Sequence, residues 1–305
     1  MQRVRGVIGL SDETSRRWNG AGVAVAILDT GIIRHPDFDR RIYAFRDFVN
    51  HGKDNNCYDD SGHGTHVAGC LAGSGLVSNG KYAGVAPGCS LIIGKVLNED
   101  GDGSVKSMVD GIDWIIAQKN YYRIRALNIS VGVAKIEDEV YREQLLSALK
   151  RAWDSGLVVV VAAGNNGPAP MSISPMAVSD FVITVGCHDG DYKSDHLCEA
   201  YSGRGPSVTH VKKPDIVAPG TDIISCCARV RRNNKGIISA YNKKSGTSMA
   251  TPLVTGAAAL LLQKEPGLSN IQVRRRIHYC ASDVGESWTK QGWGMLNVER
   301  LLFTS

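Results

Sequence analysis

The chain has 305 residues, of which 43% are hydrophobic, and it carries a formal net charge of +5. This length and composition allow a large buried core, in one large domain or two smaller ones. No stretch of 18 or more apolar residues occurs, so we expect no membrane-spanning helix. The basic clusters at 229–232 and 274–276 lack interleaved aromatic residues, so we interpret them as solvated faces and expect no nucleic-acid partner.

Two features of the sequence bear on the cellular compartment. Residues 1–20 hold six charged side chains and no apolar core of a secretory signal. The eight cysteines fit no zinc-ligand spacing and suggest free, buried thiols, although an even number also permits disulfides. We therefore expect a cytoplasmic protein with a short N-terminal arm, residues 1–20, that needs no large pro-segment. The alternative is a secreted protein whose pro-region has been trimmed.

Apolar runs alternate with helical patterns along the chain. Near-continuous hydrophobic runs predict buried strands at Gly22–Thr30, Ser90–Leu97, Arg125–Gly132, Gly156–Asn165 and Phe181–Cys187. Helical spacing predicts helices over Ser104–Lys119, Val140–Gly156 and Leu253–Gln263. This alternation predicts an α/β fold with a doubly wound, mostly parallel central sheet and helices on both faces. No linker or repeat divides the chain, so we predict a single domain, 1–305.

Three polar side chains stand at the ends of such elements, where functional groups gather in doubly wound sheets. Asp29 closes the first strand, His63 opens the small-residue helix "HGTHVAGCLAG", and Ser248 opens the apolar helix near the C-terminus. A serine hydroxyl needs a base to remove its proton, and a carboxylate can orient that base. An Asp-His-Ser triad of a hydrolase is therefore one interpretation of these three residues.

Structural interpretations of the same residues stay open. Asp29 can be a turn residue, and Ser248 with its neighbours can cap the helix that follows. His63 can be a cap or a packed imidazole, with His66 as the base instead. The chain order Asp, His, Ser matches one of the known triad orders and differs from the order Ser, Asp, His of α/β-hydrolase esterases.

The motifs "AILDTGI", "HGTHVAG" and "GTSMATP" around these three residues together resemble the subtilisin-like serine proteases. The flanking stretches "GVAP", "KVL", "NISVG", "AAGN" and "KPDIVAPG" are similar to that family as well. The resemblance runs from about Gly20 to Leu302. The absence of a long pro-region is typical of the intracellular, bacterial-type members.

The resemblance implies a serine endopeptidase that works through an acyl-enzyme. It assigns Ser248 as the nucleophile, His63 as the general base and Asp29 as the orienting carboxylate. His63 is preferred over His66 because it occupies the first position of "HGTH". Asn165 of "AAGN" is expected to donate its amide N–H to the oxyanion, beside the backbone N–H of Ser248. The alternative is a catalytically silent pseudoprotease on the same fold, although all four residues are present.

The resemblance also implies an extended peptide or protein substrate that pairs with the enzyme as a strand. Two segments are expected to line the pocket for the residue before the cleaved bond: Ser130, Val131 and Gly132 on one side, and Ala162, Ala163 and Gly164 on the other. The segment Asp100–Ser104, with Gly103, is expected to pair with residues further upstream. Val133 stands where the family often has a second glycine.

Acidic turns in "NNCYDDSG" and "DGDG" raise the question of calcium, which prefers several oxygen ligands. Asp54, Asp59 and Asp60 are the candidates for a structural calcium site, although the stretch Gly73–Pro87 does not clearly match the family's calcium loop. We expect no metal or cofactor in catalysis, since His63 and His66 lack the HExxH arrangement of metalloproteases.

Overall fold

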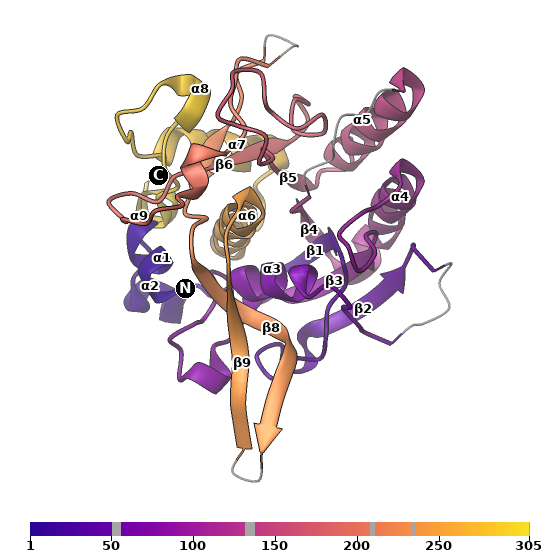
Figure 1. The fold of residues 1–305 in the computed structure, drawn as a ribbon, viewed down its shortest axis with the longest axis vertical. Helices are drawn as coiled ribbons and strands as arrows, with labels where there is room; N and C mark the ends of the chain where they lie inside the picture. Colours follow the sequence, from indigo (N-terminus) through magenta and orange to yellow (C-terminus); the bar gives the residue numbers. More distant parts are fainter. Residues whose placement is uncertain (51–55, 132–137, 208–210, 234–235, 305) are drawn as a thin grey trace.

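The structure is a computed structural model, and it describes residues 1–50, 56–131, 138–207, 211–233 and 236–304. A seven-stranded sheet with the order β2-β3-β1-β4-β5-β6-β7 forms its centre, and every neighbouring pair in it is parallel (Figure 1). The strands are β1 (Ala24–Asp29), β2 (Ile42–Asp47), β3 (Ser90–Lys95), β4 (Ile124–Ile129), β5 (Val158–Ala162), β6 (Ile183–Cys187) and β7 (Ile216–Ala218). The predicted doubly wound, mostly parallel sheet is confirmed.

Side chains of the central strands are buried on both faces, which explains their near-continuous hydrophobic sequences. Along β1, Val25 and Ile27 belong to one hydrophobic cluster, and Ala26 and Leu28 belong to the other. This alternation follows from the two-residue period of a strand. A polar side chain therefore has no place along β1 until the strand ends at Asp29.

Helices cover both faces of the sheet (Figure 1). On one face lie α3 (His63–Ala72), α6 (Thr247–Lys264), α7 (Asn270–Cys280) and α9 (Val298–Phe303), and on the other α4 (Val105–Tyr122) and α5 (Glu139–Asp154). Residues 247–262 of α6 are all buried. A helix that is apolar all round is typical of such a central position. No described helix combines the length and hydropathy that crossing a membrane requires.

The N-terminal arm forms two short helices, α1 (Gln2–Val7) and α2 (Asp12–Arg17). Met1, Val4, Ile8 and Leu10 are buried in the same hydrophobic cluster as α6 and α9. The carbonyl of Ile8 accepts a hydrogen bond from the N–H of Val298, at 2.7 Å. The arm is therefore part of the packed core on this side of the sheet.

A long antiparallel hairpin projects from the body of the protein (Figure 1). Its strands are β8 (Ile223–Asn233) and β9 (Gly236–Lys244). The sequence analysis did not predict it, because basic and polar residues interrupt both strands. The half-exposed edge strand β2 was missed for a similar reason, and β7 was missed because it has only three residues. The remaining short elements are η1 (Asp39–Arg41), η2 (Leu76–Ser78), η3 (Cys198–Ala200) and α8 (Trp288–Gln291).

The strand register determines which residues meet at the carboxyl edge of the sheet. Leu28 of β1 is opposite Ile129 of β4, which is opposite Val161 of β5. The residues that follow these positions, Asp29, Ser130 and Ala162, therefore lie side by side at this edge. All three were singled out from the sequence.

Candidate active site

Asp29 is completely buried at the end of β1 and is in contact with His63. Its Oδ1 atom accepts hydrogen bonds from the Thr30 N–H at 2.8 Å and from His63 Nδ1 at 2.7 Å. The first turn of α3 approaches the turn after Asp29 so closely that a Cβ on Gly64 would lie 2.2 Å from the Gly31 carbonyl oxygen. Glycine at position 64 is therefore required for this pairing.

His63 is the first residue of α3, and its side chain is one quarter exposed. Burial is the largest single influence on its pKa and lowers it, whereas the Asp29 charge and hydrogen bond raise it. On balance the pKa of His63 is raised above its ordinary value, while Lys244 opposes the rise and Asp59 adds to it. The Nδ1 contact with Asp29 leaves Nε2 as the ring nitrogen that can act as a base.

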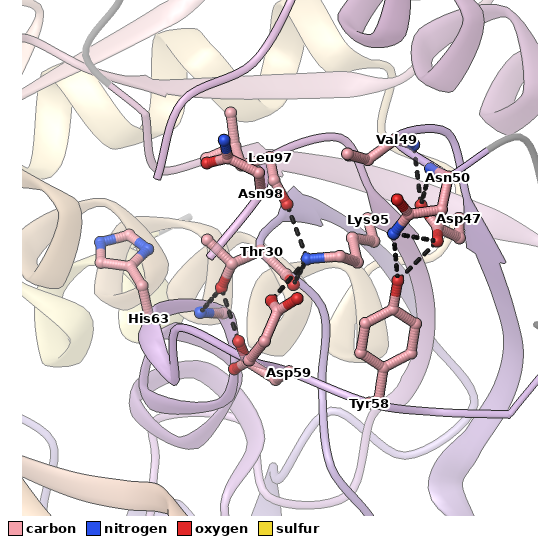
Figure 2. Close-up of polar contacts among 12 residues, drawn as sticks. Thr30, Asp47, Val49, Asn50, Tyr58, Asp59, His63, Lys95, Leu97 and Asn98 are labelled. Atoms are coloured by element: carbon pink, nitrogen blue, oxygen red, sulfur yellow. Dashed lines mark hydrogen bonds and ion pairs between the residues drawn. The ribbon is translucent and has the colours of Figure 1, made fainter. Parts of the chain in front are cut away.

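Asp59 and Thr30 join the start of α3 to the turn after Asp29 (Figure 2). Asp59 Oδ1 accepts hydrogen bonds from Thr30 Oγ1 at 2.8 Å and from the Gly62 N–H at 2.7 Å. Asp59 Oδ2 accepts from the Thr65 N–H at 2.8 Å and from Thr65 Oγ1 at 2.6 Å. Thr30 Oγ1 in turn accepts from the Gly64 N–H at 2.9 Å. A carboxylate suits this place, because the N–H groups of a first helical turn have no partner in the helix.

These contacts involve two of the three candidates for a calcium site, Asp54, Asp59 and Asp60. Both oxygens of Asp59 already accept hydrogen bonds from protein donors. Asp60 Oδ1 is bound to the ammonium group of Lys95, at 2.7 Å. Asp54 lies outside the described residues. Asp59 therefore binds the start of α3 and the turn after Asp29, and Asp60 binds a buried lysine.

Ser248 is the second residue of α6 and is 9% exposed. The alternative in which the hydroxyl residues before and at Ser248 cap this helix is wrong. The N-cap is Gly246, and Ser245 Oγ accepts instead from the Asp222 N–H, at 2.9 Å. The Asn165 side chain serves as the cap, since its Oδ1 accepts from the Thr247 N–H at 3.1 Å and from Thr247 Oγ1 at 3.0 Å.

The contact between Asn165 and α6 orients the amide of Asn165 at the start of the helix. With Oδ1 bound to Thr247, the Nδ2 atom is the side-chain donor that stays available. Nδ2 lies 3.3 Å from the place that a Cβ on Gly246 would occupy, and Gly246 has a φ of +146°. A larger residue at position 246 would be strained and would crowd this amide.

His66 occupies a different environment from His63. It is buried, and its Nε2 lies 3.0 Å from the Ile223 carbonyl oxygen and 3.3 Å from that of Asn242. Burial lowers the pKa of His66 to about 3. The neutral ring therefore joins α3 to the β8–β9 hairpin, and the contact with Asp29 belongs to His63.

The expected pocket residues follow β4 and β5, which are neighbouring strands. Ser130, Ala162 and Ala163 are fully buried, and Val131 is 8% exposed. Ser130 Oγ accepts from Asn128 Nδ2 at 2.8 Å, and Gly164 has a φ of +90°. Gly132 and Val133 lie outside the described residues. Gly103 is exposed in the turn before α4.

The sequence analysis missed two members of this site. It noted Lys95 only as part of a flanking motif, and it gave Thr30 no role. The signal for Lys95 was present, since a lysine that ends the buried run "SLIIGK" needs an internal partner for its charge. Thr30 carried no signal of its own, because its contacts come from residues 59 and 64.

Comparisons with known proteins agree with this geometry. Residues 20–294 match the family model described as the subtilase family, Peptidase_S8. Serine protease AprX of Bacillus subtilis (strain 168) is 41% identical over 268 residues, which cover 84% of this chain and 60% of AprX. Subtilisin DY of Bacillus licheniformis is 37% identical over 285 residues, which cover 92% of this chain and 91% of that protein.

Solved structures show the same similarity in three dimensions. Sphericase superposes with a TM-score of 0.78 at 27% identity, over 92% of each chain. The S41 psychrophilic protease superposes with a TM-score of 0.77 at 29% identity, also over 92% of each chain. The motifs, the parallel sheet and these relatives therefore lead to one conclusion: the chain belongs to the subtilase family of serine endopeptidases.

Proposed function

We propose that Asp29, His63 and Ser248 are the catalytic triad of this endopeptidase. The observation that supports this most directly is the 2.7 Å contact between His63 Nδ1 and Asp29 Oδ1, at the start of a helix packed against α6. In the proposed reaction, Ser248 Oγ attacks the carbonyl carbon of the peptide bond and His63 Nε2 takes its proton. Asp29 fixes the ring tautomer and stabilises the imidazolium that forms.

The oxyanion of the tetrahedral intermediate is held by the Ser248 N–H and by Asn165 Nδ2. The orientation of Asn165 by Thr247 supports this role, because a donor fixed in advance need not reorganise during the reaction. His63 then gives its proton to the leaving amine, and an ester between Ser248 and the acyl part of the substrate remains. A water molecule, deprotonated by His63, hydrolyses this ester and restores the enzyme.

We further propose that the substrate binds as an extended strand between two segments of the enzyme. The exposed turn with Gly103 is suited to pairing with a peptide backbone upstream of the cleaved bond. The ends of β4 and β5 form the walls of the pocket for the residue before that bond. These walls carry Val131, Ala162 and Ala163, whose side chains are small to medium in size and uncharged.

Replacing Ser248 by alanine tests the proposed triad. We expect Ser248→Ala to keep the fold and to lose peptide hydrolysis by a factor on the order of 10⁴ or more, because the nucleophile is gone. Adding His63→Ala should cost little further activity, since the triad acts as a unit. Circular dichroism checks the fold, and a fluorophosphonate probe should label the parent protein at Ser248. Labelling elsewhere, or substantial activity in purified Ser248→Ala, would contradict the assignment.

The pH dependence of kcat/KM tests the proposed base. The reaction needs neutral His63, and the pKa of His63 is raised, so activity should fall on acidification with a midpoint above the ordinary histidine value of about 6.5. Lys244→Gln removes a positive charge that lowers this pKa, so the midpoint should move to higher pH. Lys150→Gln, an exposed lysine of α5, is the matched control and should leave the midpoint unchanged. A downward shift in Lys244→Gln would refute the electrostatic account.

Cleavage of a random peptide library tests the proposed pocket. We expect a large apolar or aromatic residue before the cleaved bond, because the described walls of the pocket present no charge. Mass spectrometry of the products gives the residue preference at that position. A profile dominated by Lys, Arg, Asp or Glu would show that the pocket has been misidentified.

We also propose that catalysis needs no metal ion, since protein groups fill each proposed role. Dialysis against EDTA should leave kcat/KM unchanged below the melting temperature. The melting temperature itself reports separately on any structural calcium. Activity that is lost with EDTA at low temperature and restored by calcium would overturn the proposal.

Finally, we propose that the enzyme works in a reducing, cytoplasmic compartment. All eight cysteines are free thiols, and seven of them are buried, which supports a protein that folds without disulfides. Protein alkylated under denaturing conditions directly on cell lysis should carry eight alkyl groups by mass spectrometry. Native disulfides, or recovery of the protein from the culture medium, would favour the secreted alternative.

A further inference from the structure

Lys95 ends β3 beside the proposed triad, and its side chain is fully buried. Its ammonium nitrogen donates to the Thr30 carbonyl oxygen at 2.8 Å, to Asp60 Oδ1 at 2.7 Å and to the Leu97 carbonyl oxygen at 2.8 Å (Figure 2). An ammonium group has three N–H donors, so these contacts use all of them. The nitrogen also lies 5.1 Å from the centre of the Tyr58 ring, within the range of a cation–π contact.

The partners of Lys95 belong to segments that carry the proposed chemistry. Thr30 directly follows Asp29, and Asp60 is in the loop that leads to His63. Leu97 precedes the turn that is expected to pair with the substrate. Asp29 and Lys95 are themselves opposite each other in the sheet, and the Val96 and Leu97 N–H groups both donate to the Asp29 carbonyl oxygen.

Lys95 contacts segments that lie beyond the ends of strands β1 and β3. The β1–β3 pairing ends at Asp29 and Lys95, so regular strand pairing does not fix the segments beyond them. Tyr58 extends the same cluster to the end of β2, since its hydroxyl donates to Asp47 Oδ2 at 2.6 Å (Figure 2). One side chain therefore contacts the segments that follow β1 and β3 and the loop before α3, and reaches the end of β2 through Tyr58.

We propose that Lys95 is a positioning residue of this endopeptidase, whose buried ammonium group aligns the Asp29 turn, the His63 loop and the substrate-pairing segment with one another. This inference depends on the proposed triad. An apolar side chain would leave two carbonyl oxygens and the Asp60 carboxylate without their shared donor. The Asp29 turn and the loop before His63 would then lose one of the contacts that hold them together, and a shift of about 1 Å at such a site can lower a rate by about 100-fold.

Lys213 provides a matched control for the cost of removing a buried lysine. It is also fully buried, and its ammonium nitrogen donates to Asp215 Oδ2 at 2.6 Å and to the Val182 carbonyl oxygen at 2.9 Å. Its partners are next to β6 and β7 and include none of the proposed triad residues. Lys95→Met and Lys213→Met therefore remove the same chemical group from two places, only one of which contacts the site.

The experiment measures kcat and KM per active site, counted by fluorophosphonate titration, with a tetrapeptide p-nitroanilide and with p-nitrophenyl acetate. We expect Lys95→Met to lower kcat by about 10- to 100-fold on both substrates, because the triad is misaligned. KM should rise for the tetrapeptide alone, because the acetate does not reach the turn after Leu97. Lys213→Met should lower the melting temperature and leave kcat within about twofold of the parent.

Two further variants cover the case in which Lys95→Met does not fold. Asp60→Leu removes one acceptor at the partly exposed end of the cluster and should lower kcat about tenfold, while Asp60→Asn keeps an acceptor oxygen and should restore most of it. Parent-like kcat in folded Lys95→Met or Asp60→Leu would overturn the proposal, as would an equal loss in Lys213→Met. Failure of the triad itself is a separate result, because the parent would then not be labelled at Ser248.

Discussion

The buried negative charge of Asp29 is the constraint on which the rest of the site depends. The carboxylate has no exposed surface, and its Oδ2 atom has no hydrogen-bond partner among the described residues. A buried charge is costly unless a partner stabilises it, so the ring of His63 and the Thr30 N–H carry most of that stabilisation. The same contact raises the pKa of His63. The imidazolium form is thus stabilised next to Asp29, which suits a base that must hold a proton briefly.

The Asp29–His63 pair is surrounded by polar groups that form hydrogen bonds with one another. Asp59 binds the first turn of α3, Thr30 bridges to it, and Lys95 with Asp60 closes the far side of the cluster. Both oxygens of Asp59 and the Oδ1 atom of Asp60 are matched by N–H, O–H or ammonium donors. Such networks specify one arrangement, because the loss of any member leaves another polar group unpaired. The site is therefore held by hydrogen bonds in a region where the hydrophobic core has ended.

The sequence was informative wherever a position in the fold requires one class of residue. Strands buried on both faces must be apolar along their whole length, so β1, β3, β4, β5 and β6 were predicted from short runs. Asp29, His63 and Ser248 were singled out because functional groups gather at the ends of the elements of such a sheet. The hairpin β8–β9 was not predicted, because basic and polar residues interrupt the apolar runs of both strands.

The sequence was less informative where a role depends on partners far along the chain. Asp59 has the residue type of a calcium ligand, and only the positions of Thr30, Gly62 and Thr65 show that it binds the start of a helix. The hydroxyls near Ser248 have the types of helix caps, yet the cap comes from Asn165, 82 residues earlier than Thr247. Residue types limit the chemistry that is available, and long-range contacts decide which of it is used.

The position of Ser248 on α6 makes the proposed nucleophile depend on the folded core. This helix is buried over residues 247–262 and packs against the sheet and α3, so its first turn cannot loosen while the core stays intact. The proposed nucleophile therefore keeps its position only while the core is folded. With Ser248 as the nucleophile, a copy whose core has opened loses its activity and becomes an extended substrate for folded copies.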